Sequence, residues 1–447
     1  MSDSSAVRPT LIRGGRVLDP ASGHDDVADV MLGGDGRILE VATSLEGHID
    51  SSVAVIEAHD RLVTPGFVDL HTHLREPGHE YKETVATGSA SAVAGGFTTI
   101  LCMANTQPVN DTGSVTRFIV DKARECGLAR VLPIGAVSRG MKGEALAEIG
   151  DMIANGAVAV SDDGLPVMDA HLMRCALEYT AGLGVPVIAH EEDSCLAGRG
   201  CMHEGEVATR LGLPGIPGAS EDIMVARDIV LAELTSGHLH VAHVSTEASV
   251  RMIRDAQARG VRVTTEVTPH HFTLSDEAVE GYDTATKMAP PLRSVSDRDA
   301  IIEALKDGTI CCIATDHAPH ATVNKDLEFE LAANGVVGLE TAWGLTVKLV
   351  EAGHFDLMTA VRLLTSGPAE CFGLDLGSLK PGAPADIAII DPNASQEVEA
   401  QQLFSKSSNT PFAGWELPHR IERTIFGGRT VYLWDGQRGE VGFQDMG

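Results

Sequence analysis

Short runs of β-branched and apolar residues alternate with longer segments of helical periodicity from about residue 63 to residue 375. This alternation predicts an α/β protein with a parallel sheet, because a helix that crosses over between two strands keeps them parallel. Eight strands are the number that closes a (β/α)8 barrel, or TIM barrel. The candidate strands here are VTPGFVDLHTH, FTTILCMANT, VLPIGAVS, AVAVSDDG, VPVIAHEED, HLHVAHVS, VRVTTEVTPHH and ICCIATDHAPH.

The segments between these runs predict an outer ring of helices. TGSVTRFIVDKARECG (112–127) and DAHLMRCALEYTAGLG (169–184) place apolar residues three or four apart and end in glycine, which helix C-caps prefer. Residues 1–62 and 376–447 instead alternate like strands joined by glycine-rich turns. We therefore expect a barrel over residues 63–375 and one small β-sandwich domain that both chain ends build together.

The composition excludes some classes of partner. A formal net charge of -29 and a pI near 4.9 argue against nucleic acid and anionic membranes, since both bind clustered Lys and Arg. The N-terminus lacks the apolar region of a signal peptide, and no apolar run could span a bilayer, so we expect a cytoplasmic protein. Its eight cysteines contain no CxxC pair, which favours reduced thiols.

The stretch FVDLHTHLREPG (67–78) places His71, His73 and Arg75 on alternate positions directly after an apolar run. In an extended strand these three side chains share one face. A lone HxH pair is more often polar surface or satisfied core than a ligand pair. An apolar core nevertheless has little use for two imidazoles beside a guanidinium, so the stretch is a candidate functional site.

Polar residues also end four other predicted strands: Asp163 ends the fourth, His190 the fifth, His243 the sixth and Asp316 the eighth. The C-terminal strand ends of a barrel face one mouth, so these residues should converge with the HxH pair. Each one alone fits a turn, a cap or a packed histidine, and only their coincidence predicts a metal centre. Imidazoles and carboxylates without thiolates suit zinc, and their number exceeds the ligands of one tetrahedral ion. We therefore expect two divalent ions and the chemistry of a hydrolase.

The remaining histidines are not expected to bind metal. His270 and His271 end the seventh predicted strand and are expected to support the ligands or to pack. Five others show no pattern of partners and are expected at the surface: His171, His203, His238, His240 and His354.

Seven motifs occur in a fixed order along the chain: GFVDLHTHLREPG, MANTQPV, SDDG, AHEED, AHVST, PPLR and ATDHAPH. With them, nearly the whole chain resembles the bacterial class I dihydroorotases of the amidohydrolase superfamily. The resemblance implies reversible hydrolysis of the ring amide of L-dihydroorotate to N-carbamoyl-L-aspartate, a step of pyrimidine biosynthesis.

The resemblance also implies roles for the predicted ligands. One metal would be held by His71, His73, Asp163 and Asp316. Asp163 would bridge to a second metal held by His190 and His243, because VAVSDDG (158–164) lacks the carbamylated lysine that many relatives use as the bridge. A metal-bound hydroxide would attack the amide carbonyl. Asp316 would accept the proton of the water and pass it to the departing ring nitrogen.

Arg75 distinguishes the substrate class, because its planar guanidinium can hold the ring carboxylate that dihydroorotate carries and uncharged cyclic amides lack. The alternative is an ion pair with Glu76, Glu80 or Glu83. By resemblance, further substrate contacts are expected from Asn105, His320 and the main chain of Asn334 and Gly335.

Two alternatives remain from the sequence. Ala289 stands before the Pro-Pro-Leu-Arg turn, where many dihydroorotases have Asn, and a small residue there is also typical of allantoinases. Some dihydroorotase-like chains are non-catalytic scaffolds of aspartate carbamoyltransferase, although such chains are expected to lack metal ligands. The expected ligand is a small anionic substrate. The sequence is compatible with a homo-oligomer and with a complex with aspartate carbamoyltransferase.

Overall fold

The computed structural model describes residues 8–45, 47 and 50–442. Its centre is an eight-stranded barrel whose neighbouring strands run parallel and follow one another in chain order. Each of the eight predicted runs contains one of these strands, so the predicted barrel is confirmed. The strands are β6 (Phe67–Thr72), β7 (Phe97–Cys102), β8 (Arg130–Gly135), β9 (Ala159–Ser161), β10 (Val187–Ala189), β13 (Leu239–Val241), β14 (Val263–Val267) and β15 (Cys312–Ile313).

The first and last strands of the barrel meet just beyond their C-terminal ends. Thr72 and His317 form a parallel bridge, and the His73 amide donates to the His317 carbonyl oxygen, with 2.8 Å between nitrogen and oxygen. Closure brings the C-terminal ends of all eight strands to one mouth. Residues that are far apart in the sequence can therefore share one site.

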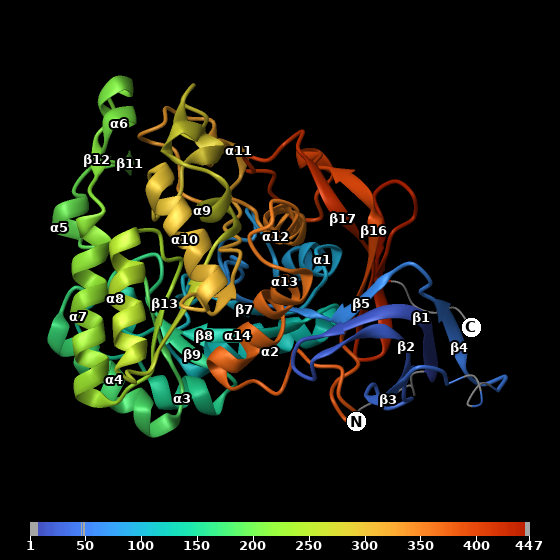
Figure 1. The fold of residues 1–447 in the computed structure, drawn as a ribbon. Helices are drawn as coiled ribbons and strands as arrows, with labels where there is room; N and C mark the ends of the chain where they lie inside the picture. The colour runs from blue at the N-terminus through green and yellow to red at the C-terminus, as the bar shows by residue number, and fades with distance from the viewer. Residues whose placement is uncertain (1–7, 46, 48–49, 443–447) are drawn as a thin grey trace.

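Helices surround the barrel (Figure 1). α2 ends at Gly127 and α4 at Gly184, whose φ angles of 66° and 74° are left-handed, so the C-caps expected from the sequence are confirmed. Asp169 starts α4 by accepting the amides of its first turn. The helices are α1 (Val85–Ala94), α2 (Gly113–Cys126), α3 (Ile149–Ala154), α4 (Ala170–Leu183), α7 (Ala219–Thr235), α8 (Glu247–Ala258), α10 (Val295–Asp307), α12 (Ala342–Glu351), α13 (Leu357–Leu364) and α14 (Ser366–Phe372).

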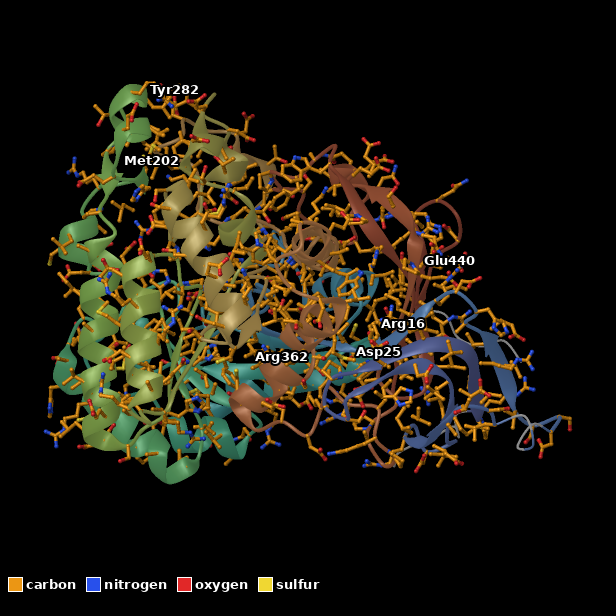
Figure 2. The ribbon with its side chains drawn as sticks, in the orientation of Figure 1. Arg16, Asp25, Met202, Tyr282, Arg362 and Glu440 are labelled. Atoms are coloured by element: carbon orange, nitrogen blue, oxygen red, sulfur yellow. The ribbon has the colours of Figure 1, made fainter. Side chains whose placement is uncertain are left out.

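One excursion leaves the barrel between β10 and α7, at the upper left of Figure 1. Figure 2 shows Met202 within it and Tyr282 near its tip. The Tyr282 hydroxyl donates to the Leu211 carbonyl oxygen at 2.8 Å, which ties the excursion to the segment before α10. The short elements are α5 (Ser194–Ala197), β11 (Met202–His203), α6 (Glu206–Leu211), β12 (Gly215–Ile216), α9 (Pro269–Thr273), α11 (Thr322–Lys325) and the 3-10 turns 139–141, 276–279, 284–286 and 400–402.

The small β-domain is built from both chain ends, as predicted (blue and red in Figure 1). Its nine strands form one continuous sheet. Arg16 and Asp25 pair across two neighbouring strands (Figure 2), with 2.7 Å between Nε and Oδ1. The strands are β1 (Thr10–Asp19), β2 (His24–Leu32), β3 (Ile38–Ala42), β4 (Ala54–Glu57), β5 (Leu62–Pro65), β16 (Ile387–Glu397), β17 (Glu416–Phe426), β18 (Arg429–Leu433) and β19 (Glu440–Val441).

β5 joins the two halves of this sheet, because it pairs with β1 on one side and with β16 on the other. The predicted domain limit after residue 62 therefore falls inside β5, and the first barrel strand begins at Phe67. A shared buried cluster fixes the two halves together; it includes Ile12, Val17, Val30, Val63, Ile387, Ile389 and Ile425.

The barrel strands present opposite faces to two different cores. Val187 and Ala189 of β10 belong to the cluster that contains the helices, whereas Ile188 between them belongs to a second cluster. This is the alternation expected of an extended strand. Within the described residues, no helix is long and apolar enough to cross a membrane.

Candidate metal centre and active site

The first barrel strand is irregular at the point where it delivers its histidines. Between Asp69 and Thr72 the register of β6 against β7 shifts. The Asp69 carboxylate supports this irregularity by accepting the amides of His71 and Thr315, both at 3.0 Å. A bulge re-aims the side chains around it. His71 and His73 consequently both face the carboxylates at the mouth of the barrel.

The outer ring nitrogens of this histidine pair have fixed partners. Nδ1 of His71 lies 2.6 Å from Oε1 of Glu266, and Nδ1 of His73 lies 2.9 Å from Oδ1 of Asn105. A carboxylate oxygen and an amide oxygen only accept hydrogen bonds, so each Nδ1 carries the proton. Each Nε2 then faces the interior of the site.

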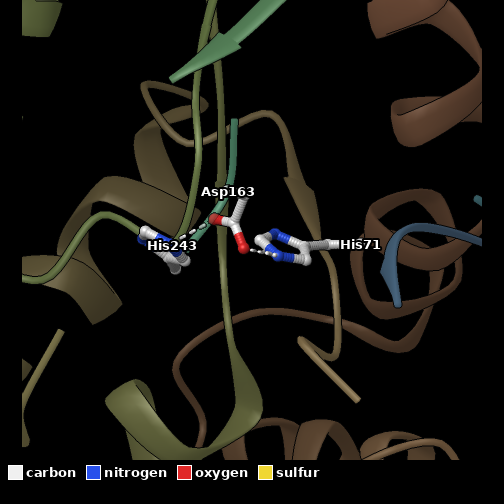
Figure 3. Close-up of side chains that lie close together, drawn as sticks. All are labelled: His71, Asp163 and His243. Carbon is white, nitrogen blue, oxygen red and sulfur yellow. Dashed lines mark hydrogen bonds and ion pairs between the residues drawn. The ribbon is translucent and has the colours of Figure 1, made fainter. Parts of the chain in front are cut away.

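The Asp163 carboxylate divides its two oxygens between two pairs of imidazoles. Oδ2 lies 3.3 Å from Nε2 of His71 and 3.5 Å from Nε2 of His73. Oδ1 lies 3.2 Å from Nε2 of His243 and 3.4 Å from Nδ1 of His190. Figure 3 shows His71 and His243 on opposite sides of Asp163. One carboxylate thus occupies the position of a bridge.

Asp316 completes the group of ligands. Its Oδ1 lies 3.0 Å from Nε2 of His73 and 3.5 Å from Nε2 of His71. On the other side of the site, Nδ1 of His190 lies 2.9 Å from Nε2 of His243. All six predicted ligands therefore converge. In two sets of three, the ligand atoms all lie within 4.8 Å of one another: His71, Asp163 and His243, and His71, His73 and Asp316.

These contacts fit positive charge between the side chains. Nε2 of His71 is buried and has no hydrogen-bond partner among the residues that the structure describes, yet it lies close to two carboxylates. Two carboxylates that face one imidazole nitrogen need positive charge there, which a proton on the ring or a metal ion supplies. Nitrogen and oxygen ligands of this kind suit zinc and similar divalent ions. The donor set therefore fits a metal centre.

The imidazoles of the site stabilise the ionised form of the Asp163 carboxylate. Burial disfavours the ionised form of Asp163, but the neighbouring imidazoles, His71 first, hold the pKa of this carboxyl well below its usual range. Three site residues, Arg75, His243 and Asp316, have left-handed φ angles of 64°, 33° and 46°. Such a conformation costs a non-glycine residue about 1–3 kcal/mol and persists where the surroundings impose it. Backbone strain thus collects at this mouth.

Arg75 lies buried beside the ligands and not in an ion pair. Its Nε donates to the Pro319 carbonyl oxygen at 3.3 Å, and its Nη2 lies 3.4 Å from Nε2 of His320. Within the described part of the chain it forms no salt bridge, so the alternative of a glutamate partner is wrong; Glu83 contacts His317 instead. Burial lowers the pKa of Arg75 to about 10, which still leaves it charged at neutral pH.

The other predicted substrate contacts differ in their surroundings. Burial and the charge of Arg75 lower the pKa of His320 to about 2, so its ring is neutral. Asn334 is exposed. The Gly335 amide donates to the Lys287 carbonyl oxygen at 2.9 Å, and the Gly335 carbonyl oxygen accepts from Lys325 Nζ at 3.1 Å. This segment is therefore held rigidly by backbone and lysine contacts.

Two family models together cover the barrel and most of the carboxy-terminal part of the small domain. Residues 60–249 match the model described as Dihydro-orotase-like, and residues 235–432 match the model described as Amidohydrolase family. A protein named Dihydroorotase from Anaeromyxobacter dehalogenans is 56% identical over 427 residues, covering 95% of this chain and 98% of that protein. The dihydroorotase of Geobacter metallireducens is 52% identical over 422 residues, covering 94% and 99%. The chain belongs to the dihydroorotase family.

Membership of the dihydroorotase family confirms the predicted function, hydrolysis of a cyclic amide by a metal-dependent enzyme. The fold is shared more widely. L-Hydantoinase from Arthrobacter aurescens matches with a TM-score of 0.86 at 24% identity, over 97% of each chain. D-Hydantoinase from Thermus sp. matches with a TM-score of 0.84 at 25% identity, over 97% of this chain and 98% of that one.

Within this dihydroorotase fold, Glu266 is a site residue to which sequence reasoning gave no role. Its Oε2 lies 3.2 Å from Nε2 of His240, whose Nδ1 lies 2.8 Å from the Thr264 hydroxyl. Burial opposes ionisation, but His71 and His240 lower the pKa of Glu266 to about 2. A charged carboxylate therefore links His71 to a second buried histidine.

The expectation that His238 and His240 lie at the surface is wrong, because their side chains are 3% and 0% exposed. His240 lies on β13 and His238 directly before it, and both contact the hydroxyl of Thr264 on the next strand. The HLH spacing, the same as in the first strand, was the available signal. His271 packs as expected, between the Thr268 hydroxyl and the Pro290 carbonyl oxygen.

Proposed function

We propose that the barrel mouth hydrolyses the ring amide of L-dihydroorotate reversibly, with Asp316 as the proton-transfer group and Arg75 as the anchor of the substrate carboxylate. The observation that carries this proposal is the Asp163 carboxylate shared between two imidazole pairs, near a buried guanidinium that forms no salt bridge with a described residue. The shared carboxylate supports amide hydrolysis, and the guanidinium supports a substrate with an anionic ring.

The proposed cofactor is zinc, with two ions in each subunit. His71, His73, Asp163 and Asp316 would hold one ion, and Asp163, His190 and His243 the other. When bound, such ions lower the pKa of a water and polarise a carbonyl group. Asp163 would take the bridging position because β9 and its following turn, residues 159–164, contain no lysine.

Asp316 is placed to move a proton. Burial disfavours its charge, but His71 and then His73 hold the pKa of Asp316 below its usual range, so its carboxylate is ready to accept. The contact of 3.0 Å with His73 Nε2 fixes the orientation of this carboxylate. We propose that it takes a proton from the attacking water and returns it to the departing ring nitrogen, which makes one residue the general base and then the general acid.

Arg75 would set substrate choice. Its Nε and Nη2 have contacts on the protein, and it forms no salt bridge with a carboxylate of any described residue. A ring carboxylate can pair with such a guanidinium, and burial strengthens the pair because water screens it less. Asn105, His320, Asn334 and Gly335 are proposed to contact the remainder of the substrate. Of these, Asn105 also holds His73.

The proposal extends to the partners and the location of the protein. We propose a cytoplasmic enzyme that acts on a small anionic substrate and binds neither nucleic acid nor membranes. A homo-oligomer and a complex with aspartate carbamoyltransferase are the assemblies to test by sedimentation with and without that enzyme. The scaffold alternative expects metal ligands to be missing, whereas the predicted ligands converge here.

The test is a metal analysis coupled to a substrate panel. We expect the purified protein to contain divalent metal and to open L-dihydroorotate but neither allantoin nor dihydrouracil. A preference for allantoin would instead indicate an allantoinase, the alternative that Ala289 suggests. Protein that folds but neither contains metal nor acquires it from added zinc would refute the proposed centre.

A further inference from the structure

A cavity of about 200 Å³ lies between the barrel and the small β-domain. Its walls come from α12 of the barrel, from β17 and β18 of the small domain, and from residues 395–404. Neither the proposed metal ligands nor the proposed substrate contacts line it. The cavity is therefore separate from the barrel mouth.

Three buried nitrogens at this cavity have no hydrogen-bond partner among the residues that the structure describes: Trp343 Nε1, His419 Nδ1 and Arg420 Nε. The Trp343 side chain is 3% exposed. Indole and guanidinium nitrogens can only donate hydrogen bonds, and a buried donor is unfavourable without an acceptor. Two of the three atoms are therefore buried donors that lack an acceptor, and both belong to residues that line the cavity.

Four aromatic side chains contribute to the walls of the cavity, although only 4% of the chain is aromatic: Trp343, Phe404, Tyr432 and Trp434. Phe404 and Tyr432 pack edge to face, with 6.0 Å between ring centroids. Two arginines stack on rings of the same wall: Arg420 lies 4.6 Å from the centroid of Trp434, and Arg438 lies 4.5 Å from that of Phe404. Such surfaces favour a planar ring, which can stack on aromatic and guanidinium faces.

One wall residue is connected to the barrel mouth by direct contacts. Oε1 of Glu340 accepts the amide of Ser405 at 3.2 Å, and the Ser405 hydroxyl donates to Glu83. Glu83 in turn lies 3.3 Å from Nε2 of His317, the neighbour of Asp316 in the chain. The cavity is thus part of the packing that supports the site without sharing its residues.

We propose that this interdomain cavity binds a small planar ring that carries carbonyl or carboxylate oxygens. The ring would stack between the aromatic walls, and its oxygens would accept from Trp343 Nε1 and Arg420 Nε. The assignment stands on the unpartnered donors and the aromatic side chains of the walls, and it does not depend on the reaction proposed for the barrel mouth.

The chain contains three tryptophans, and only Trp343 and Trp434 line the cavity, which permits a direct test. The full-length, metal-loaded protein is labelled with 5-fluorotryptophan and titrated with uracil, benzoate and cyclohexanecarboxylate while its fluorine NMR spectrum is recorded. Uracil offers neutral carbonyls on a planar ring, benzoate offers a planar carboxylate, and cyclohexanecarboxylate offers the same charge without a flat ring.

We expect uracil or benzoate to shift the Trp343 resonance saturably and to leave the Trp415 resonance unchanged. The probe that binds identifies whether the cavity prefers carbonyl or carboxylate oxygens. Trp343→Phe keeps a ring but removes the donor, and it should weaken binding about tenfold in calorimetry. Trp415→Phe, outside the cavity, should bind like the wild type.

Three results would overturn the proposal: neither planar probe shifts Trp343, cyclohexanecarboxylate binds as well as benzoate, or Trp343→Phe binds with unchanged affinity. If the Trp343→Phe protein does not fold, the wild-type titration alone decides. Loss of dihydroorotate hydrolysis in the substrate panel would leave these outcomes unaffected, because the readout is binding.

Discussion

The two imidazole pairs of the proposed metal centre differ in the side chains that contact their outer nitrogens. The outer nitrogens of His71 and His73 meet oxygens of Glu266 and Asn105. For His190 and His243, in contrast, no side chain in the described part of the chain hydrogen-bonds the nitrogen that faces away from Asp163, and that of His243 is buried. We call the first the supported pair and the second the unsupported pair.

Because of this difference, we expect the two halves of the proposed centre to bind metal with different affinities. A partner behind a metal-binding histidine fixes its tautomer and orientation and raises its basicity, and loss of such a partner typically costs 10–100-fold in metal affinity. Asp163 is common to both halves, so the asymmetry arises from the imidazoles. The supported pair should hold its ion more tightly.

The largest effect should come from removing the charge that both pairs share. Asp163→Asn should reduce the bound metal to at most one ion per chain and lower kcat by about 10³-fold or more, because both halves lose their anionic ligand. Asp162→Asn is the control: Asp162 accepts the amides of Val137 and Ser138, so the change should lower the midpoint of thermal unfolding but spare the metal content. Equal metal content in both variants would contradict the bridging role.

Stepwise removal of metal tests the asymmetry directly. With an increasing concentration of chelator, we expect one ion to leave first and the second to require at least about tenfold more chelator. His190→Asn should abolish the first step and keep the second, as measured by atomic absorption on the dialysed protein. A single step for both ions, or loss of the tight ion in His190→Asn, would show that the two halves are equivalent.

Removing the support should make the two pairs alike. Glu266→Gln takes the charge from behind His71 and should weaken the tighter zinc site by about 10–100-fold, measured by chelator competition on metal-depleted protein. Glu303→Gln, on the exposed face of α10, is the matched control. If zinc affinity is the same in both variants, Glu266 does not support the centre.

The smallest effect should appear in substrate binding beside the supported pair. Arg75→Lys keeps the charge but loses the planar fork, so KM for dihydroorotate should rise about tenfold while the metal content stays unchanged. Steady-state kinetics with parallel metal analysis measures both. An unchanged KM would remove Arg75 from the substrate site.

The barrel and the convergence of the six proposed ligands could be predicted from sequence because their signals are local. Each strand is a short apolar run, each following turn carries its polar residues, and helices such as α4 end at a glycine with left-handed φ. Barrel closure then converts five separate segments into one site. Nothing beyond the order of the strands is needed for that convergence.

The support behind the ligands could not be predicted in the same way. His71 and Glu266 are 195 positions apart, and the local sequence VTTEV does not indicate which residue its glutamate contacts. The buried position of His240 cannot be predicted from its own segment, because it depends on Thr264 and Glu266 on the neighbouring strand. The register shift in β6 likewise arises from a contact between Asp69 and the last strand.

The position of β5 between β1 and β16 has a consequence for synthesis of the chain. The amino-terminal strands emerge from the ribosome first, but the edge of β5 acquires its neighbour only when Ile387 and the residues after it have been translated. Until then an open strand edge is available to other nascent copies. A carboxy-terminal truncation before Ile387 should therefore yield aggregated chains rather than an isolated barrel.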